Sequence, residues 1–353
     1  MITGLDKLLE ESGQPGLAEL RRLLQELLGG SGTATRVQLL DQHRLPARRP
    51  RAYRLRFVIN RWIRSVVIKR LELAAAERTQ LLIRRWLPAI GLGDNGPTLL
   101  GTAAEHSGQC VWHVYDDLGA RALAASPPET EHVRTVVDLI AQVHTRFTRH
   151  PLLAECRLHG GDRGINFYAA NVREGIYSLE SLKAPAVALS EENASLRDRL
   201  LARLHQLAEE QPKRAQALAE FGGAETLLHG DLWTNNTFVL PSSHGVQARL
   251  VGWDHAGVGP ICYDLSTFLL RFPVRHRPWI LDLYHGAVRS AGWTLPSVRE
   301  LNFLFETAEF ARFANCIIWP ALALVHDRIG WGFEELANVE QWFDHWEPVL
   351  PVQ

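Results

Sequence analysis

The sequence predicts an α+β fold of two lobes, a small antiparallel β-sheet lobe and a larger, mostly helical lobe. Short alternating or β-branched apolar runs crowd into residues 35–116, with one helical repeat among them. From residue 129 onward, apolar residues recur mostly every three or four positions, as on the buried face of a helix. With 353 residues, 46% of them hydrophobic, the chain is long enough to build two cores.

The expected elements of the first part follow in chain order. Leucines at helical spacing over residues 5–28 predict two short helices broken at Gly13–Gly16. We therefore expect a helical extension over residues 1–33, a sheet lobe over residues 34–116 and a helical lobe over residues 117–353. In the sheet lobe the patterns predict a helix over residues 72–87 and five strands, Thr35–Leu40, Ala52–Ile59, Arg64–Leu71, Leu99–Leu100 and Val111–Tyr115.

In the second part, a helical period covers Glu129–Phe147 and Glu191–Gln211 and returns after Tyr263. Short strand-like runs are expected within Leu227–Leu240 and Ala248–Trp253. The stretch Leu158–Ser178 contains Gly and Asn, and we expect it to be irregular.

Composition and charge exclude several classes of protein. A net charge of -1 is unlike that of a strongly basic nucleic-acid binder. The four cysteines are scattered singly, which disfavours structural zinc and a disulfide framework and is typical of reduced thiols in a cytosol. No apolar run approaches the roughly 20 residues that span a bilayer, and the N-terminus lacks a signal-peptide pattern. We expect a cytoplasmic protein without nucleic-acid or membrane partners.

The segment His229-Gly230-Asp231-Leu232-Trp233-Thr234-Asn235-Asn236 carries the clearest chemistry. It lies between two apolar runs, and Asn236 follows Asp231 by five positions. A loop held between short strands can present the Asp231 carboxylate to an acceptor hydroxyl and the Asn236 oxygen to a metal ion. Phosphoryl transfer needs both a carboxylate that orients the nucleophile and a hard oxygen ligand for Mg²⁺.

This segment resembles the H-G-D-x-x-x-x-N loop of the aminoglycoside phosphotransferase and choline kinase superfamily, which has a protein-kinase-like fold. The resemblance implies an ATP- or GTP-dependent kinase that phosphorylates a hydroxyl group of a small molecule. It also implies that Asp231 is the catalytic base, that Asn236 binds Mg²⁺, and that His229 and Gly230 shape the loop.

A second segment, residues 250–265, resembles the family pattern I-D-W-E-x-A-G-x-G-x-x-x-Y-D-L. The resemblance implies that Asp264 ties the catalytic loop down by hydrogen bonds. Aligning Trp253 and Gly257 places Gly252 where the family has a metal-binding Asp. This chain departs from the family at that position.

Two interpretations of the departure stay open. In an extended strand, residues 252 and 254 point to the same side about 6.6 Å apart, so Asp254 is able to take over as the metal ligand. Alternatively, no carboxylate replaces the missing one. The protein is then a pseudokinase that binds nucleotide with weak or no turnover, or it uses its nucleotide site for another transfer such as nucleotidylation.

Lys69 is one of few lysines in an arginine-rich chain, and it lies in the expected strand Arg64–Leu71. Alternation places it on a face with Val67, where an unpaired ammonium is costly. Glu77, on the following helix, is the expected partner. The resemblance implies that this pair contacts the α- and β-phosphates of the nucleotide.

Other positions are assigned by their place in the family order. Tyr115 and Asp116 match the hinge whose backbone binds adenine, and we expect the side chains of Asp116 and Asp117 to be exposed. His144 is expected to pack within its helix bundle. The arginines of the loop His43–Arg51 either contact phosphates or form a solvated turn.

The acceptor is the least defined part. Acids and tryptophans beyond Leu265 favour a cationic acceptor such as an amino sugar or amino alcohol, whereas Arg271, Arg275, Arg277 and Arg312 equally suit an anionic one. The acids are Asp282, Glu300, Glu306, Glu309, Asp327, Glu334, Glu335, Glu340, Asp344 and Glu347.

Overall fold

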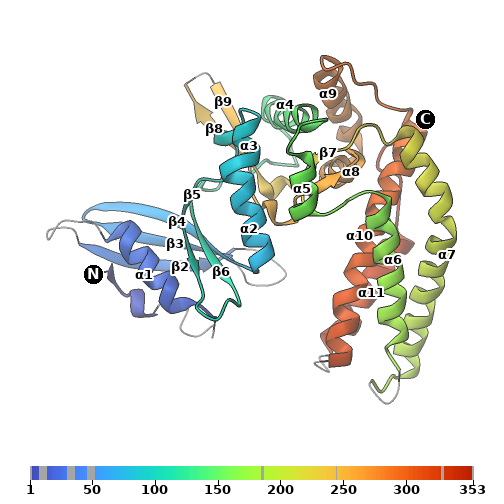
Figure 1. The fold of residues 1–353 in the computed structure, drawn as a ribbon, viewed down its shortest axis with the longest axis horizontal. Helices are drawn as coiled ribbons and strands as arrows, with labels where there is room; N and C mark the ends of the chain where they lie inside the picture. Colours follow the sequence, from blue (N-terminus) through green and yellow to red (C-terminus); the bar gives the residue numbers. More distant parts are fainter. Residues whose placement is uncertain are drawn as a thin grey trace. The chain divides into compact units, whose positions relative to one another are not determined.

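A computed structural model separates a sheet-containing unit from a helical unit (Figure 1). Unit 1 comprises the described residues up to Leu123 together with Asn235–His255, and unit 2 comprises Ala124–Thr234 and the described residues from Ala256 onward. The division falls at other positions than those expected from the sequence. The structure describes residues 2–7, 14–29, 36–45, 52–183, 187–243, 245–326 and 330–351.

Unit 1 is built on a six-stranded sheet in the order β1-β2-β3-β4-β6-β5. Every neighbouring pair is antiparallel except β1 and β2, which run parallel. The five strands expected from the sequence are all present, and the short β1 is an addition. The strands are β1 (Ile2–Thr3), β2 (Val37–Arg44), β3 (Ala52–Ile59), β4 (Trp62–Leu71), β5 (Leu99–Ala104) and β6 (Val111–Asp116).

The core of this unit lies between the sheet and helix α1 (Leu17–Leu28), which follows the 3₁₀ turn η1 (Leu5–Lys7). Leu20, Leu24 and Leu28 of α1 are buried at intervals of four residues and pack with Val66 and Ile68 of β4. Burial of each such side chain stabilises the fold by about 1.5–3 kcal/mol. The N-terminal helix therefore packs into the sheet unit.

Three further pieces complete unit 1. The expected helix over residues 72–87 is present as α2 (Leu73–Leu81), a π-helical turn (Leu82–Trp86) and α3 (Leu87–Ala89). A 3₁₀ turn (Gly93–Asn95) precedes β5. The hairpin of β8 (Thr237–Ser242) and β9 (Gly245–Leu250) joins from the middle of the chain, with Asn95 donating a hydrogen bond to the Ala248 carbonyl oxygen at 2.9 Å.

Unit 2 is helical apart from one short antiparallel pair, β7 (Thr226–Leu228) with β10 (Gly257–Gly259). Its main core is formed by α6, α7, α10 and α11, which run side by side (Figure 1). The α+β fold class expected from the sequence is confirmed. The helices are α4 (Thr130–Phe147), α5 (Leu153–Gly160), α6 (Ile165–Glu180), α7 (Glu191–Phe221), α8 (Cys262–Leu270), α9 (Arg277–Arg289), α10 (Val298–His326) and α11 (Trp331–Asp344), with a 3₁₀ turn at Val274–His276.

The expectation of an irregular stretch over Leu158–Ser178 is wrong, because α5 and α6 occupy most of it. Its Gly and Asn residues are packing residues. A Cβ added to Gly175 would lie 2.9 Å from Leu204 Cδ1, so glycine permits the close approach of α6 to α7. Asn171 is buried and accepts a hydrogen bond from Asn315 on α10 at 2.8 Å. A polar side chain such as that of Asn171 can be buried between helices when it is hydrogen-bonded, so its presence does not indicate a loop.

Helix α10 is the one helix in the described part of the chain that is long and apolar enough to cross a membrane by length and composition. More than half of its apolar window, 56%, is buried inside the protein. Its buried face packs against α6, α7 and α11. It is therefore the central core helix of unit 2.

Candidate active site

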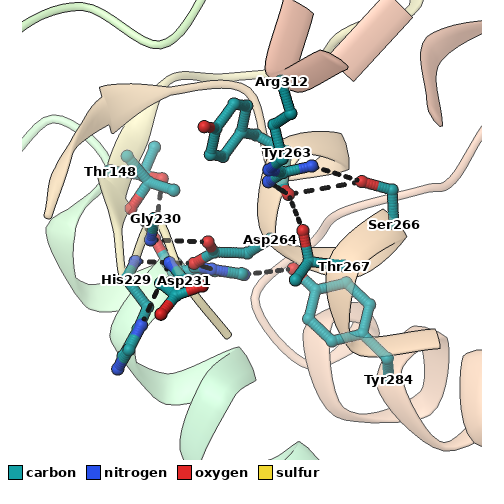
Figure 2. A network of polar contacts seen from close by, with 12 residues as sticks. Thr148, His229, Gly230, Asp231, Tyr263, Asp264, Ser266, Thr267, Tyr284 and Arg312 are labelled. Atoms are coloured by element: carbon teal, nitrogen blue, oxygen red, sulfur yellow. Dashed lines mark hydrogen bonds and ion pairs between the residues drawn. The ribbon is translucent and has the colours of Figure 1, made fainter. Parts of the chain in front are cut away.

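The loop after β7 is held by a buried carboxylate in unit 2. Asp264, at the start of α8, is 1% exposed and accepts the backbone N–H of His229 at 2.7 Å and that of Gly230 at 2.9 Å. Figure 2 shows Asp264 lying against these two residues, with Asp231 next to them. Each carboxylate oxygen thus satisfies one backbone donor, which fixes the direction in which the chain leaves β7.

Asp264 is charged in this buried position because its neighbours stabilise the anion. Burial acts to raise the pKa of Asp264, but hydrogen bonds from His144 and the backbone N–H of Gly230 outweigh it and hold this pKa below its ordinary value. His144 Nε2 lies 3.4 Å from Asp264 Oδ2, and His144 Nδ1 lies 2.8 Å from the Tyr284 hydroxyl. His144 therefore supports the carboxylate as well as packing in its helix.

Asp231 follows the pinned residues at a sharp turn. Gly230 has a φ of 81°, a left-handed conformation that favours glycine. The N–H of Asp231 lies 3.3 Å from His229 Nδ1, and the Asp231 carbonyl accepts the N–H of Trp233 at 2.9 Å. Asp231 is half-buried, so its carboxylate is partly accessible to an acceptor.

Lys69 forms an ion pair within unit 1. Its Nζ lies 2.5 Å from Asp254 Oδ2, and the two side chains are 23% and 22% exposed. Asp254 lies in a 3₁₀ turn (Trp253–His255), and its carbonyl accepts a hydrogen bond from Arg78 on α2. The turn is therefore fastened to the sheet lobe at two atoms. Glu77 lies exposed on α2, and its pairing with Lys69 stays a prediction.

The segment before Asp254 is not the extended strand that the sequence analysis assumed. Strand β9 ends at Leu250, and Gly252 has a φ of 78°, which is incompatible with a regular strand. Asp254 therefore reaches Lys69 from a turn, and the 6.6 Å strand spacing does not apply to residues 252 and 254.

Gly252 faces Asn236 directly. A Cβ built on Gly252 would lie 2.8 Å from Asn236 Oδ1 and 3.0 Å from its Cγ. A carboxylate at position 252 would thus adjoin the amide that the sequence assigns to Mg²⁺. This direction agrees with the alignment that places Gly252 at the position of a metal-binding Asp.

The fit of these residues to Mg²⁺ depends on their chemistry. Mg²⁺ usually binds through one or two protein carboxylates together with waters and substrate phosphates. In unit 1, Asn236 offers an amide oxygen and Asp254 a carboxylate oxygen, which suit a hard cation. No group of three or more His, Cys, Asp or Glu side chains arranged for a metal occurs in the part of the chain that the structure describes. The donor set suits an ion that the nucleotide helps to bind.

Tyr115 and Asp116, the residues assigned to the hinge, are the last two residues of β6. Asp116 is exposed, as expected, and its N–H donates to the Thr98 carbonyl at 3.0 Å. The expectation that Asp117 is exposed is wrong, since its side chain is 8% exposed and pairs with Arg54 of β3 at 2.8 Å. An ion pair with the neighbouring strand withdraws this carboxylate from solvent. Residues 46–51 of the arginine-rich loop lie outside the described residues.

His113, a polar residue beside Lys69 in the sheet, was not identified from the sequence. His113 lies opposite Lys69 in the β4–β6 ladder, is fully buried, and contacts the Tyr115 hydroxyl at 2.8 Å. Burial lowers the pKa of His113 to about 4, with the nearby Asp254 opposing the shift and Lys69 adding to it. Alternation in Val111–Tyr115 places His113 and Tyr115 on one face, which is the signal that could have found them.

Comparison with known proteins agrees with this geometry. Residues 83–301, more than half of the chain, match the model of the phosphotransferase enzyme family. No curated protein sequence matches the chain significantly.

Solved structures with the same fold are numerous and distant in sequence. A spectinomycin phosphotransferase in complex with ADP and spectinomycin is 12% identical, with a TM-score of 0.59 and coverage of 96% of both chains. An ethanolamine kinase of Plasmodium vivax is 11% identical, with a TM-score of 0.57 and coverage of 96% of this chain and 94% of that chain. Choline kinase LicA of Streptococcus pneumoniae is 11% identical, with a TM-score of 0.52 and coverage of 93% and 98%.

The resemblance expressed by the two motifs is therefore confirmed, and so is the two-lobed kinase-like fold that it implied. Because the family's model covers more than half of the sequence and the structural neighbours share the fold over nearly its whole length, the chain belongs to the phosphotransferase enzyme family.

Proposed function

We propose that this protein transfers the γ-phosphoryl group of ATP or GTP to a hydroxyl group of a small molecule in the cytoplasm. The acceptor oxygen forms a bond to the γ-phosphorus, the bond from that phosphorus to the bridging oxygen breaks, and the nucleoside diphosphate leaves. Asp231 accepts the hydroxyl proton. The observation that carries the proposal is the catalytic loop pinned by buried Asp264, in a chain that belongs to a phosphotransferase family.

The other assigned residues have roles consistent with this reaction. Lys69, already held by an acidic partner, supplies a cation for the nucleotide phosphates. Asn236 and Asp254 would hold Mg²⁺, which neutralises phosphate charge when it is bound. The backbone at Tyr115 and Asp116 would bind the nucleotide base. The acceptor expected from the acids beyond Leu265 is an amino sugar or amino alcohol, and the proposed phosphoryl transfer does not depend on that choice.

A second candidate function rests on Gly252. The position that aligns with the metal-binding Asp has no side chain, and its α-carbon adjoins Asn236. A protein with one carboxylate fewer at this place is a candidate pseudokinase, which binds nucleotide and turns it over weakly or not at all.

Nucleotide binding and turnover separate the two candidates. We would measure Mg²⁺-dependent ATP binding by calorimetry, and then ATP consumption against a panel of hydroxyl compounds. Asp231→Asn should lower turnover by about 10²- to 10⁴-fold with little change in ATP affinity, because it removes the base and keeps the shape of the side chain. Asp94→Asn, at an exposed position in the 3₁₀ turn Gly93–Asn95, is the matched control and should leave turnover unchanged.

Two results would contradict parts of this proposal. One is ATP binding without consumption on any acceptor, which favours the second candidate. The other is acceptor-dependent consumption that is equal in the wild type and in Asp231→Asn, which removes Asp231 from the reaction.

A further inference from the structure

Four of the ten acids beyond Leu265 are engaged by other residues of the protein. Glu306 accepts a hydrogen bond from buried Arg214 at 2.7 Å, and Glu340 pairs with Arg199 at 2.6 Å. Glu309 is bound by Arg312 and by the Ser266 hydroxyl, and Glu300 caps its own helix at Ser297. Glu306, Glu309 and Glu340 are therefore neutralised by arginines and Glu300 is occupied at its helix cap, which weakens the case for a cationic acceptor.

Arg271 is in the opposite situation. Its guanidinium lies over the ring of Trp233 at 3.9 Å from the ring centre, and Trp233 belongs to the loop that carries Asp231. Its Nε is buried and has no hydrogen-bond partner within the described residues, and no carboxylate there forms an ion pair with it. Stacking occupies one face of the guanidinium plane and leaves its edge able to bind two oxygen atoms.

The neighbours of Arg271 add positive charge. Burial lowers the pKa of Arg271; Glu309 and Asp231 oppose the shift, and Arg312 adds to it. Arg271 in turn contributes to lowering the pKa of Arg277, behind the effect of burial. Of the acids that act on Arg271, Glu309 is neutralised by Arg312. Among the described residues, Arg271 thus has no ion pair of its own, and Asp231 is the remaining acid that acts on it.

We propose that the acceptor carries an anionic group, a carboxylate or a phosphate, in addition to its hydroxyl, and that the Arg271 guanidinium stacked on Trp233 binds this group beside Asp231. This inference rests on the proposed function and defines its substrate class. It replaces the expectation of an acceptor that is recognised by acidic side chains. The same hydroxyl compound in cationic or neutral form lacks the group that Arg271 binds.

Two series of acceptors with matched skeletons test the proposal. The hexose series is glucose, glucosamine, glucuronate and glucose 6-phosphate, and the three-carbon series is glycerol, serinol, glycerate and glycerol 3-phosphate. Binding to the full chain is measured at millimolar acceptor with a non-hydrolysable ATP analogue and Mg²⁺ present, and ATP consumption is measured in parallel. The carboxylate and phosphate members distinguish the two kinds of anion.

Variants locate the effect at Arg271. Arg271→Met should weaken binding of the preferred anionic member and raise its KM by about 10- to 100-fold, because a charge-assisted bidentate contact is lost. Arg271→Lys should retain part of the affinity, and thermal unfolding of both variants shows that they are folded. Arg289→Met, which removes an exposed arginine at the C-terminal end of α9, is the matched control and should behave as the wild type.

The outcomes separate this inference from the proposed function. An anion preference that is lost in Arg271→Met supports the inference. A preference for neutral or cationic members, no binding of any anionic member, or an anion preference unchanged in Arg271→Met overturns it and leaves the phosphotransferase in place if ATP is consumed. Arg271-dependent anion binding without any ATP consumption contradicts the proposed function instead.

Discussion

Replacing Asp264 with Asn tests how the catalytic loop is held. The carboxylate is 1% exposed and gives one oxygen to each of two backbone N–H groups, at 2.7 and 2.9 Å. An Asn side chain has the same shape but only one oxygen. The NH₂ group of the Asn side chain is a donor. It would therefore face one of the two backbone N–H groups, and that N–H would have no acceptor.

The expected loss of stability follows from these bonds. A hydrogen bond to a charged group contributes about 1.5–3 kcal/mol, and a neutral one about 0.5–1.5 kcal/mol. The variant converts one bond to a neutral one and leaves the other buried N–H unsatisfied, which costs about 1–3 kcal/mol. We therefore expect Asp264→Asn to lower the free energy of unfolding by about 2–4 kcal/mol.

Denaturant unfolding of the full chain measures this loss, and turnover measures its effect on the loop. Turnover should fall by about 10²-fold, because Asp231 is displaced from its orientation, while ATP affinity should change little. Asp94→Asn is the exposed control. A loss of less than about 0.5 kcal/mol, the range of ordinary surface substitutions, would refute the view that Asp264 holds the loop.

The Asp264 carboxylate should also make the free energy of unfolding depend on pH. The pKa of Asp264 is lowered from its ordinary value of 3.8 in the folded protein. Its contribution to stability is therefore complete above pH 3.8 and is lost as the pH falls through the lowered pKa. Asp264→Asn should lack this part of the acid dependence of unfolding.

Two further predictions concern unit 1. Burial lowers the pKa of His113 from 6.5 to about 4. Between pH 6.5 and 4, the imidazole is therefore protonated in the unfolded chain and neutral in the folded chain. The free energy of unfolding should fall by up to about 3 kcal/mol from pH 6.5 to 4. Denaturant unfolding should show a flatter pH dependence for His113→Gln than for the wild type, whereas the exposed control His106→Gln should behave as the wild type. Equal pH dependence in His113→Gln and the wild type would contradict the burial of a neutral imidazole. Gly252→Asp should cost about 1–2 kcal/mol in unfolding because the position has a positive φ, yet should lower the Mg²⁺ concentration needed for half-maximal ATP consumption. Gly252→Ala has the same backbone strain without the carboxylate, so equal Mg²⁺ dependence in the two variants would show that position 252 does not adjoin a metal site.

The parts of the fold that local patterns encode could be predicted from the sequence. Strand β3 has the predicted bounds, Ala52–Ile59, because every second side chain faces the core and the alternation is unbroken. The family resemblance could be recognised from His229–Asn236 because the residues of this motif are contiguous and regularly spaced. In both cases the information lies within a few residues.

The parts that depend on distant partners could not be predicted. The ion pair of Lys69 with Asp254 joins residues far apart along the chain, so local sequence patterns do not reveal it. Gly and Asn are typical of loops, so the sequence around Asn171 and Gly175 suggested one. Their packing roles arise from α7, which Gly175 approaches closely, and from α10, which donates a hydrogen bond to Asn171. The exposure of Asp117 was misjudged for the same reason, since Arg54 on a neighbouring strand determines it.

The absence of a side chain at Gly252 does not by itself decide whether the enzyme is active. Mg²⁺ in nucleotide sites needs few protein ligands, because the phosphates and waters complete its shell. Unit 1 retains one amide oxygen at Asn236 and one carboxylate at Asp254, and the Asp254 carboxylate lies against the lysine assigned to the phosphates. Nucleotide phosphates that bind Lys69 would compete with its ion pair to Asp254 and leave a carboxylate in the region where a cation is needed. Activity then depends on whether one carboxylate is enough, and the comparison of Asp with Ala at position 252 measures that directly.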